Sequence, residues 1–159
     1  MARDDGRRFR MRQGRFFLNL DVRERELLRQ LLGELRALLN LPSEDPRVQR
    51  LYPSAYADDA EKEDEYRRLT QDDLRNGRLA NVETVEETLA AEQLSEEQLV
   101  AWMQAVNSLR LILGTMLGIS QDDQELNFDP SHPDAHTMAL YGYLGGLLDE
   151  IVDAQLELL

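Results

Sequence analysis

Leucines recur along residues 27–39 at the spacing of one face of an α-helix, and this feature constrains the fold most strongly. They occupy positions 27, 28, 31, 32, 35, 38 and 39. So broad an apolar stripe needs a second apolar surface to pack against. Asp21 precedes Glu24 by three residues, as in a capping box, and Leu41-Pro42 ends the pattern. The sequence therefore predicts a helix over about residues 21–40 in a mainly α protein.

Alternation around a glycine predicts a short β-hairpin before this helix. Phe9 and Met11 alternate with arginines ahead of Gly14, and apolar residues at positions 16, 18 and 20 alternate after it. A lone hairpin is marginal in water, so we expect its apolar face to pack on helices.

Capping patterns and prolines divide the rest of the chain. Asp58 or Asp59 begins one predicted helix, and Thr70 with Asp73 offers a second start. Ser95 with Gln98 forms a capping box that opens a helix reaching Gly118, whose later part is apolar on nearly all sides. A short helical turn is expected near residues 47–51, and Pro133 suits the first turn of a last helix.

The predicted architecture is a single domain, residues 1–159, of five or six helices with a short N-terminal β-hairpin. A flexible basic arm covers residues 1–8 and the hairpin residues 9–20. Helices follow over residues 21–118, then an acidic loop over 119–132 and a C-terminal helix over 133–159.

Charge is distributed unevenly along the chain. The 159 residues carry a net charge of −13. Residues 1–78 hold 17 basic and 16 acidic side chains, whereas residues 79–159 hold 15 acids and one base, Arg110. No apolar run is long enough to span a bilayer and the first twenty residues lack a signal-peptide core, so we expect a cytoplasmic protein without membrane contact.

Several classes of chemistry lack their usual sequence signals. The chain has no cysteine, which excludes disulfides, thiolate metal sites and a Cys nucleophile within it. There is also no phosphate-binding glycine loop, dinucleotide fingerprint or nucleophile–base pattern. We therefore expect a protein that is not an enzyme and needs no cofactor.

Charged helix faces are the first candidate contact surface for a protein partner. Acids recur every four residues on the last helix, a spacing that destabilises an isolated helix unless bases offset it. Arginines of the first half or a basic partner could supply those bases. The candidate partner-binding residues are Arg67, Arg68, Arg75 and Arg78 on one side and Asp149, Asp153 and Glu157 on the other. The apolar terminus, residues 156–159, is expected to pack within the monomer, with a homodimer interface as the alternative.

Two further functions remain open. The arginine arm could bind DNA phosphates through Arg7, Arg8, Arg10, Arg12 and Arg15, although the overall negative charge opposes this. His132 and His136, with Asp134, could support a metal-dependent activity, but a helix start explains them more simply. Alternate oxygens over residues 122–129 resemble a calcium loop but fail the EF-hand spacing.

Structural roles are assigned to four residues: Arg110, Trp102, Tyr52 and Tyr56. Arg110 interrupts an apolar run, and a buried arginine needs a carboxylate partner. Asp72, Asp73 or an acid of residues 58–65 is the expected partner.

Four segments carry a resemblance to a known family: residues 50–56 (RLYPSAY), residues 65–70 (EYRRLT), residues 102–114 and residues 141–144. Together they resemble a small actinobacterial family of acidic proteins described as a domain of unknown function. Its members are often labelled oxidative-stress transcriptional regulators, AosR-like, and their genes commonly lie beside that of the ClpS protease adaptor. The resemblance implies a cytosolic regulatory or adaptor role with a protein partner, although a cysteine-based redox switch cannot operate in this sequence.

Overall fold

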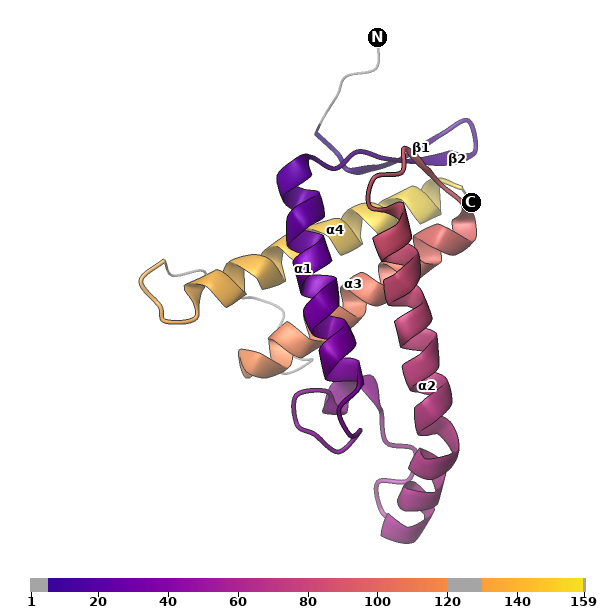
Figure 1. Cartoon of the computed structure of the whole chain (residues 1–159), viewed down its shortest axis with the longest axis vertical. Helices are drawn as coiled ribbons and strands as arrows, with labels where there is room; N and C mark the ends of the chain where they lie inside the picture. Colours follow the sequence, from indigo (N-terminus) through magenta and orange to yellow (C-terminus); the bar gives the residue numbers. More distant parts are fainter. Residues whose placement is uncertain (1–5, 120–129, 159) are drawn as a thin grey trace.

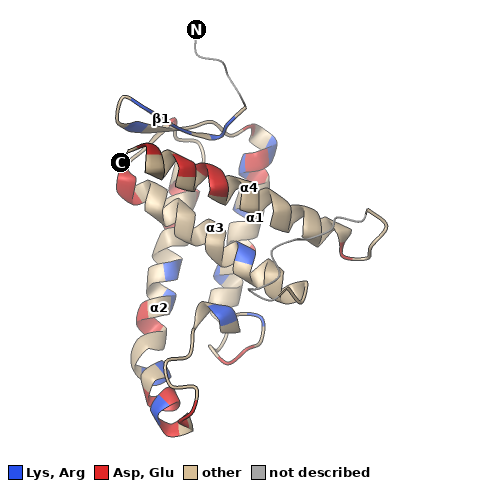
Figure 2. Ribbon diagram, turned by 180° about the vertical axis from the view of Figure 1, so that it is seen from behind, with Lys and Arg blue, Asp and Glu red and all other residues tan. Residues whose placement is uncertain are grey.

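Two crossed pairs of helices and a small sheet make up this mainly α protein, a computed structural model that describes residues 6–119 and 130–158 (Figure 1). The helices are α1 (Val22–Leu39), α2 (Ala60–Thr88), α3 (Glu96–Met116) and α4 (Ala135–Glu157). A 3₁₀ turn, η1 (Gln49–Leu51), packs on α3. α1 and α2 form one layer, and α3 and α4 form a second that crosses it (Figures 1 and 2).

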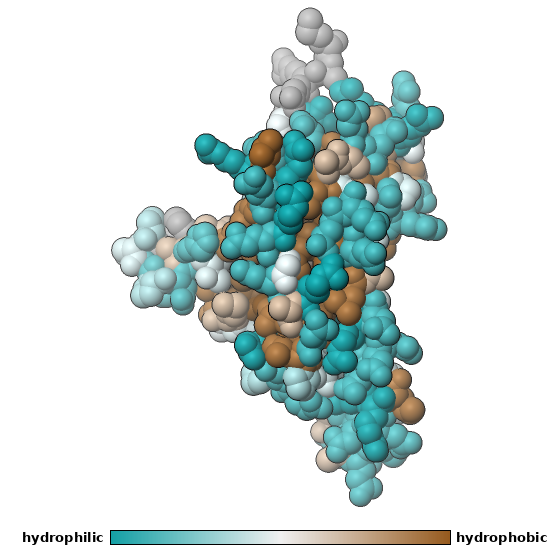
Figure 3. All heavy atoms as spheres, in the orientation of Figure 1, coloured by the Kyte–Doolittle hydropathy of each residue, from teal (hydrophilic) through white to brown (hydrophobic). Residues whose placement is uncertain are grey.

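The leucine stripe of α1 lies in the core between these layers. The Asp21 side chain accepts the Glu24 amide and Glu24 accepts the Asp21 amide, so the predicted capping box is confirmed. Five leucines of α1 are buried: Leu28, Leu31, Leu32, Leu35 and Leu39. Figure 3 shows hydrophilic side chains over the outer sides of α1 and α2, with an apolar seam between them.

The predicted hairpin is present and gains a third strand. β1 (Phe9–Arg12) pairs antiparallel with β2 (Arg15–Leu18) through Gln13 and Gly14, whose φ angles are 51° and 73°. Positive φ at both positions matches the two-residue turn that fits strand twist. β3 (Gln93–Leu94), which the sequence prediction missed, pairs with β2. Phe9 and Phe16 are buried against the helices, as expected.

The expected count of five or six helices is wrong for the described residues, which form four α-helices and η1. Two predicted helices are one continuous helix, α2. Thr70 does not cap a new start, because its hydroxyl donates to the Tyr66 carbonyl one turn earlier, at 2.8 Å. This bond lets threonine lie inside a helix, so the cap-like Thr70-x-x-Asp73 pattern gave a false boundary.

α3 is the central helix, as predicted, and packs on both α2 and α4. Its capping box at Ser95 and Gln98 is confirmed, and Gly118, with φ 71°, follows its end. α4 begins at Ala135, two residues after the predicted start at Pro133. The predictions for residues 1–5, for residues 120–129 of the acidic loop with their calcium-like spacing, and for Leu159 lie outside the described residues.

Candidate functional site

An apolar groove opens where the first turn of α3 meets the last turns of α4 and β2. Its volume is about 470 Å³, and buried Phe16 and Leu99 are among its lining residues. Four further apolar side chains border it while remaining exposed, at 38% for Val100, 38% for Val152, 58% for Leu156 and 40% for Leu158. Figure 1 shows the end of α4 beside the start of α3. We call this hollow the α3–α4 groove.

The exposure of Leu156 and Leu158 corrects a prediction. Both were expected to pack within the monomer, but Leu156 lies on the side of α4 away from buried Ile151 and Ala154, and Leu158 lies just past the end of the helix, at its C-cap. Sequence reasoning also missed Val100 and Val152. Val152 and Leu156 are four residues apart and share a helix face, which is the only local signal for the groove.

One acid lines the α3–α4 groove, and further acids stand on the neighbouring surface of α4. Glu96 lines it, and Asp149, Asp153 and Glu157 are exposed along α4. Figure 2 shows acidic residues gathered along the C-terminal half of α4. The last turn of α4 contains no basic residue, so its side chains do not offset the negative end of the helix dipole. Asp149 and Asp153 stand three residues before Val152 and Leu156 on α4 and so lie beside its apolar wall, whereas Glu157 lies toward Arg7.

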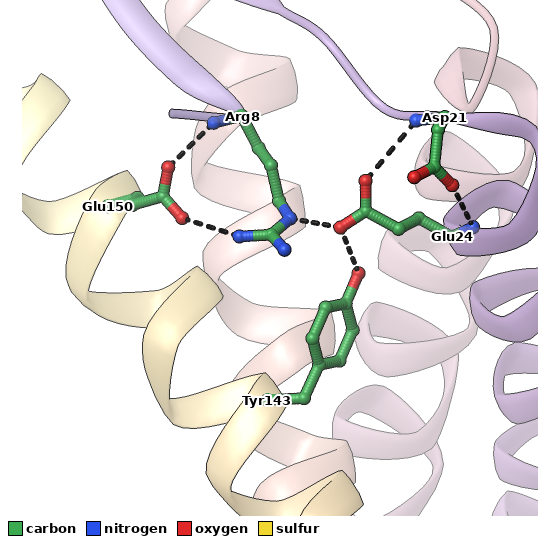
Figure 4. Close-up of polar contacts among 5 residues, drawn as sticks. All are labelled: Arg8, Asp21, Glu24, Tyr143 and Glu150. Atoms are coloured by element: carbon green, nitrogen blue, oxygen red, sulfur yellow. Dashed lines mark hydrogen bonds and ion pairs between the residues drawn. The ribbon is translucent and has the colours of Figure 1, made fainter. Parts of the chain in front are cut away.

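Arg8 anchors the hairpin to both helix layers (Figure 4). Its backbone N–H and its Nη1 donate to the two carboxylate oxygens of Glu150, at 2.6 and 3.2 Å. Its Nε donates to Glu24, which also accepts the Tyr143 hydroxyl at 3.1 Å. The guanidinium group lies 5.3 Å from the centre of the Tyr143 ring. We call these four residues the Arg8 cluster.

Burial and neighbouring charges shift the pKa of two members of the Arg8 cluster, Arg8 and Tyr143. Burial opposes the charge of Arg8, but the hydrogen bond and charge of Glu24, together with Glu150, outweigh it and raise the pKa of Arg8. Burial, followed by the charge of Glu24 and the hydrogen bond to it, raises the pKa of Tyr143. Tyr143 is therefore a protonated donor at neutral pH, and the cluster acts as a structural clamp.

Arginines and one aromatic ring share the outer face of the sheet. Arg10 lies opposite Phe17 and Arg12 opposite Arg15, and directly opposed residues in antiparallel strands project to the same face. A shallow groove of about 460 Å³ is lined by this face, with Arg7, Arg8, Arg10, Arg12 and Phe17 among its residues. Arg7 also lies 3.9 Å from Glu157. The structure thus brings the candidate nucleic-acid residues together, with Arg8 engaged in the clamp.

Two of the α2 arginines point into the protein. Arg75 donates to the carbonyls of Leu39 and Leu41, at 2.8 and 3.3 Å, and so caps the end of α1. Arg78 donates to the Ser108 hydroxyl at 3.0 Å and to the carbonyl of Leu51 at 2.9 Å. Burial lowers the pKa of Arg78. Both guanidinium groups bind carbonyls at the ends of helical segments.

The other two α2 arginines make bonds along their own helix. Arg67 donates to Glu63 at 3.2 Å, and Arg68 donates to the Asp64 carbonyl at 3.4 Å. Arg68 is exposed, whereas the Arg67 side chain is only 16% exposed. Of the four candidate arginines on α2, Arg68 is thus the one on an exposed surface.

Arg110 does not meet the predicted carboxylates. Its guanidinium carbon lies 4.8 Å from the centre of the Tyr141 ring, and its Nε lies 3.6 Å from where a Cβ on Gly145 would stand. Within the described chain no ion pair joins Arg110 to Asp72, Asp73 or residues 58–65. The partner prediction is wrong because Arg110 lies on the α4 side of α3, where an aromatic face receives the cation.

Trp102 and Tyr52 lie in the core, and Tyr56 lies outside it. Trp102 is fully buried, its Nε1 donates to the Thr88 hydroxyl at 2.8 Å, and Phe9 meets its ring edge-on at 5.4 Å. Tyr52 is buried beside η1, whereas Tyr56 is 46% exposed and meets Tyr66 edge-on.

The two histidines lie around the start of α4. The Asp134 amide donates to His132 Nδ1 at 3.0 Å, and His136 lines an apolar hollow between α1, α3 and α4. Among residues 6–119 and 130–158, no three His, Asp or Glu side chains lie close enough together to hold a metal ion. None of the helices described in the structure has the length and apolarity that crossing a bilayer requires.

Fold and surface together define a mainly α protein with a clamped N-terminal sheet and an exposed apolar groove. A family model described as a domain of unknown function, DUF2017, matches residues 6–155. The chain belongs to this family. Neither a curated protein nor a solved structure matches the chain.

Proposed function

We propose that this protein is a non-enzymatic regulatory or adaptor protein that binds a protein partner through the α3–α4 groove. The observation that carries the proposal is the exposure of four apolar side chains, Val100, Val152, Leu156 and Leu158, around one hollow. Contiguous apolar surface is costly in water, and folded monomers usually keep it for binding.

The resemblance to AosR-like regulators supports a finer proposal. Membership of the DUF2017 family is compatible with that actinobacterial group, and the resemblance suggests regulation of transcription in the cytoplasm. The chain has no cysteine, so any response to oxidative stress runs through another residue or through the partner.

Capture of binding proteins tests the proposal. Tagged protein is compared with a Val152→Ser/Leu156→Ser variant, which removes apolar surface without changing charge, and with Leu69→Ser as control. Leu69 is 72% exposed on α2 and does not line the groove. We expect proteins that both wild type and Leu69→Ser retain and the groove variant loses. No specific protein, or one set recovered by all three, would contradict the proposal.

A second candidate function is direct binding of nucleic acid by the outer face of the sheet. Arg10, Arg12 and Arg15 stand there around Phe17, and arginines beside an aromatic ring can contact phosphates while a base stacks on the ring. Gel-shift titration at several salt concentrations tests this. Retardation that weakens with salt and with Arg12→Gln/Arg15→Gln supports it, and no retardation at low salt excludes it.

A further inference from the structure

We infer that the α3–α4 groove binds a basic amphipathic helix of a partner protein. This inference rests on the proposed function and specifies the partner's chemistry. Its basis is an apolar hollow with acids beside it. A ligand that fits both must place apolar side chains in the hollow and positive side chains against the acids.

The acids beside the groove keep their negative charge among the residues that the structure describes. Glu157, the next acid along α4, meets Arg7 at 3.9 Å, with the two side chains 47% and 51% exposed, so water screens this pair strongly. Within the described residues, Asp149 and Asp153 form no ion pair, and both are exposed. The carbonyl end of α4 adds the negative pole of its dipole beside them.

Three arginines of the described chain make their contacts away from this border. Arg8 binds Glu24 and Glu150, and Arg75 and Arg78 bind carbonyls of α1 and η1. One base stands at the β2 side of the border, where Arg15 and Glu96 line a neighbouring hollow. Positive side chains of a ligand would therefore lie toward α4, facing Asp149 and Asp153.

This charge distribution decides among the possible occupants. A second copy docked on the same groove would bring two patches of the same acidic character together, and like charges repel. Nucleic acid and anionic lipid surfaces meet the same repulsion. A basic protein segment gains attraction instead, because its Lys or Arg side chains face carboxylates while its apolar side chains enter the hollow.

The shape of the groove suits a helix. Val152 and Leu156 are four residues apart on α4, and Glu96 and Val100 are four apart on α3, so one turn of each helix forms a wall. Side-chain ridges of a third helix fit between two packed helices. An amphipathic helix with apolar residues three and four apart presents the matching face.

Fluorescence anisotropy with synthetic peptides and the full chain tests the inference. The probe is a labelled amphipathic helix with leucines on one face and lysines on the other. A second peptide carries glutamate in place of lysine, and a third has the composition of the first in a scrambled order. We expect the basic helix to bind, with affinity falling as salt rises, and the other two to bind at least about tenfold more weakly.

Variants locate the binding. Val152→Ser/Leu156→Ser should weaken the basic helix about tenfold, and Leu69→Ser should leave its affinity unchanged. Asp149→Asn/Asp153→Asn should weaken it severalfold and flatten its salt dependence. Equal binding of the acidic or scrambled peptide, or no effect of the groove substitutions, would overturn the inference. So would a wild-type dimer that Val152→Ser/Leu156→Ser converts to monomer.

The two proposals fail separately. A captured protein lost from the groove variant, without binding of the basic helix, would refute the inference and leave the proposed function standing. Binding of the basic helix to the groove, without any groove-dependent protein from the lysate, would refute the proposed function and leave standing only the preference of the groove for a basic helix.

Discussion

Replacing Arg8 by methionine should loosen the attachment of the sheet to the helices. Arg8 joins β1 to Glu24 of α1 and to Glu150 of α4. Methionine keeps most of the apolar stem and removes the guanidinium group, so the two carboxylates lose their shared cation. The backbone bond from residue 8 to Glu150 survives, since it does not depend on the side chain.

The expected loss follows from the exposure of the pairs. The Arg8 side chain is 33% exposed, and those of Glu24 and Glu150 are 16% and 18% exposed. Hydrogen bonds to charged groups contribute about 1.5–3 kcal/mol when buried, and exposed ion pairs about 0–1 kcal/mol. Arg8→Met should therefore lower the free energy of unfolding by about 2 kcal/mol, or the Tm by about 4–8 °C in a chain of this size.

Tryptophan fluorescence provides the assay. Trp102 is the only tryptophan, it is fully buried, and Phe9 of β1 contacts its ring. Its emission in a urea titration therefore follows both unfolding and detachment of β1. High salt should destabilise the wild type more than the variant, because the variant has already lost the screened ion pairs.

Arg12→Met is the matched control. Arg12 ends β1, the strand that Arg8 immediately precedes, is exposed, and makes no ion pair within the described chain. It should change the free energy of unfolding by less than about 0.5 kcal/mol. An Arg8→Met loss as small as that of Arg12→Met, with unchanged salt dependence, would refute the assignment of the Arg8 cluster as a clamp.

Three further substitutions test other contacts. Thr88→Val should cost about 1–2 kcal/mol in urea titrations, because the buried Nε1–H of Trp102 loses its acceptor, whereas Thr84→Val, whose half-buried hydroxyl bonds only the Ala80 carbonyl of its own helix, should cost less; equal losses would contradict this. The Tyr56 amide, with Arg67 and the Ala55 amide, holds the pKa of Glu63 below its ordinary value, so this contribution is present above the unfolded pKa and is lost as the pH falls through the lower folded pKa. Protection of the Tyr56 amide from hydrogen exchange should fall in acid, and Glu63→Gln should abolish that pH dependence; unaltered protection would contradict it. Gly77→Ala, inside α2 with open space for a Cβ, should raise the free energy of unfolding by about 0.5–1 kcal/mol and shift the urea midpoint upward. A lower midpoint would contradict this.

Local signals predicted most of the helices and the hairpin. The capping boxes at Asp21 and Ser95 and the leucine stripe of α1 act within a few residues, so sequence alone shows them. The false break at Thr70 arose because a hydroxyl can cap a helix or bond one turn back inside it, and only neighbouring structure decides. The two-residue β3 has too few residues for a periodic signal.

The α3–α4 groove could not be predicted in the same way. Its lining comes from β2, the start of α3 and the end of α4, which meet only in the folded chain. The acids on α4 were recognisable from their spacing, but not the apolar side chains beside them. Arg110 shows the same limit, since its acceptor is the ring of Tyr141 on another helix.

The bond from Arg8 to Glu150 spans 142 positions and has a consequence for how the protein is made. Ribosomes release a chain from its N-terminus, so β1 emerges long before the helix that holds it. Until α4 follows, Arg8 lacks its Glu150 contact, and until α3 follows, Phe9 lacks the Trp102 ring. A nascent chain cut short before α4 would therefore hold its hairpin through Glu24 alone, with the apolar side of the sheet less covered than in the finished protein.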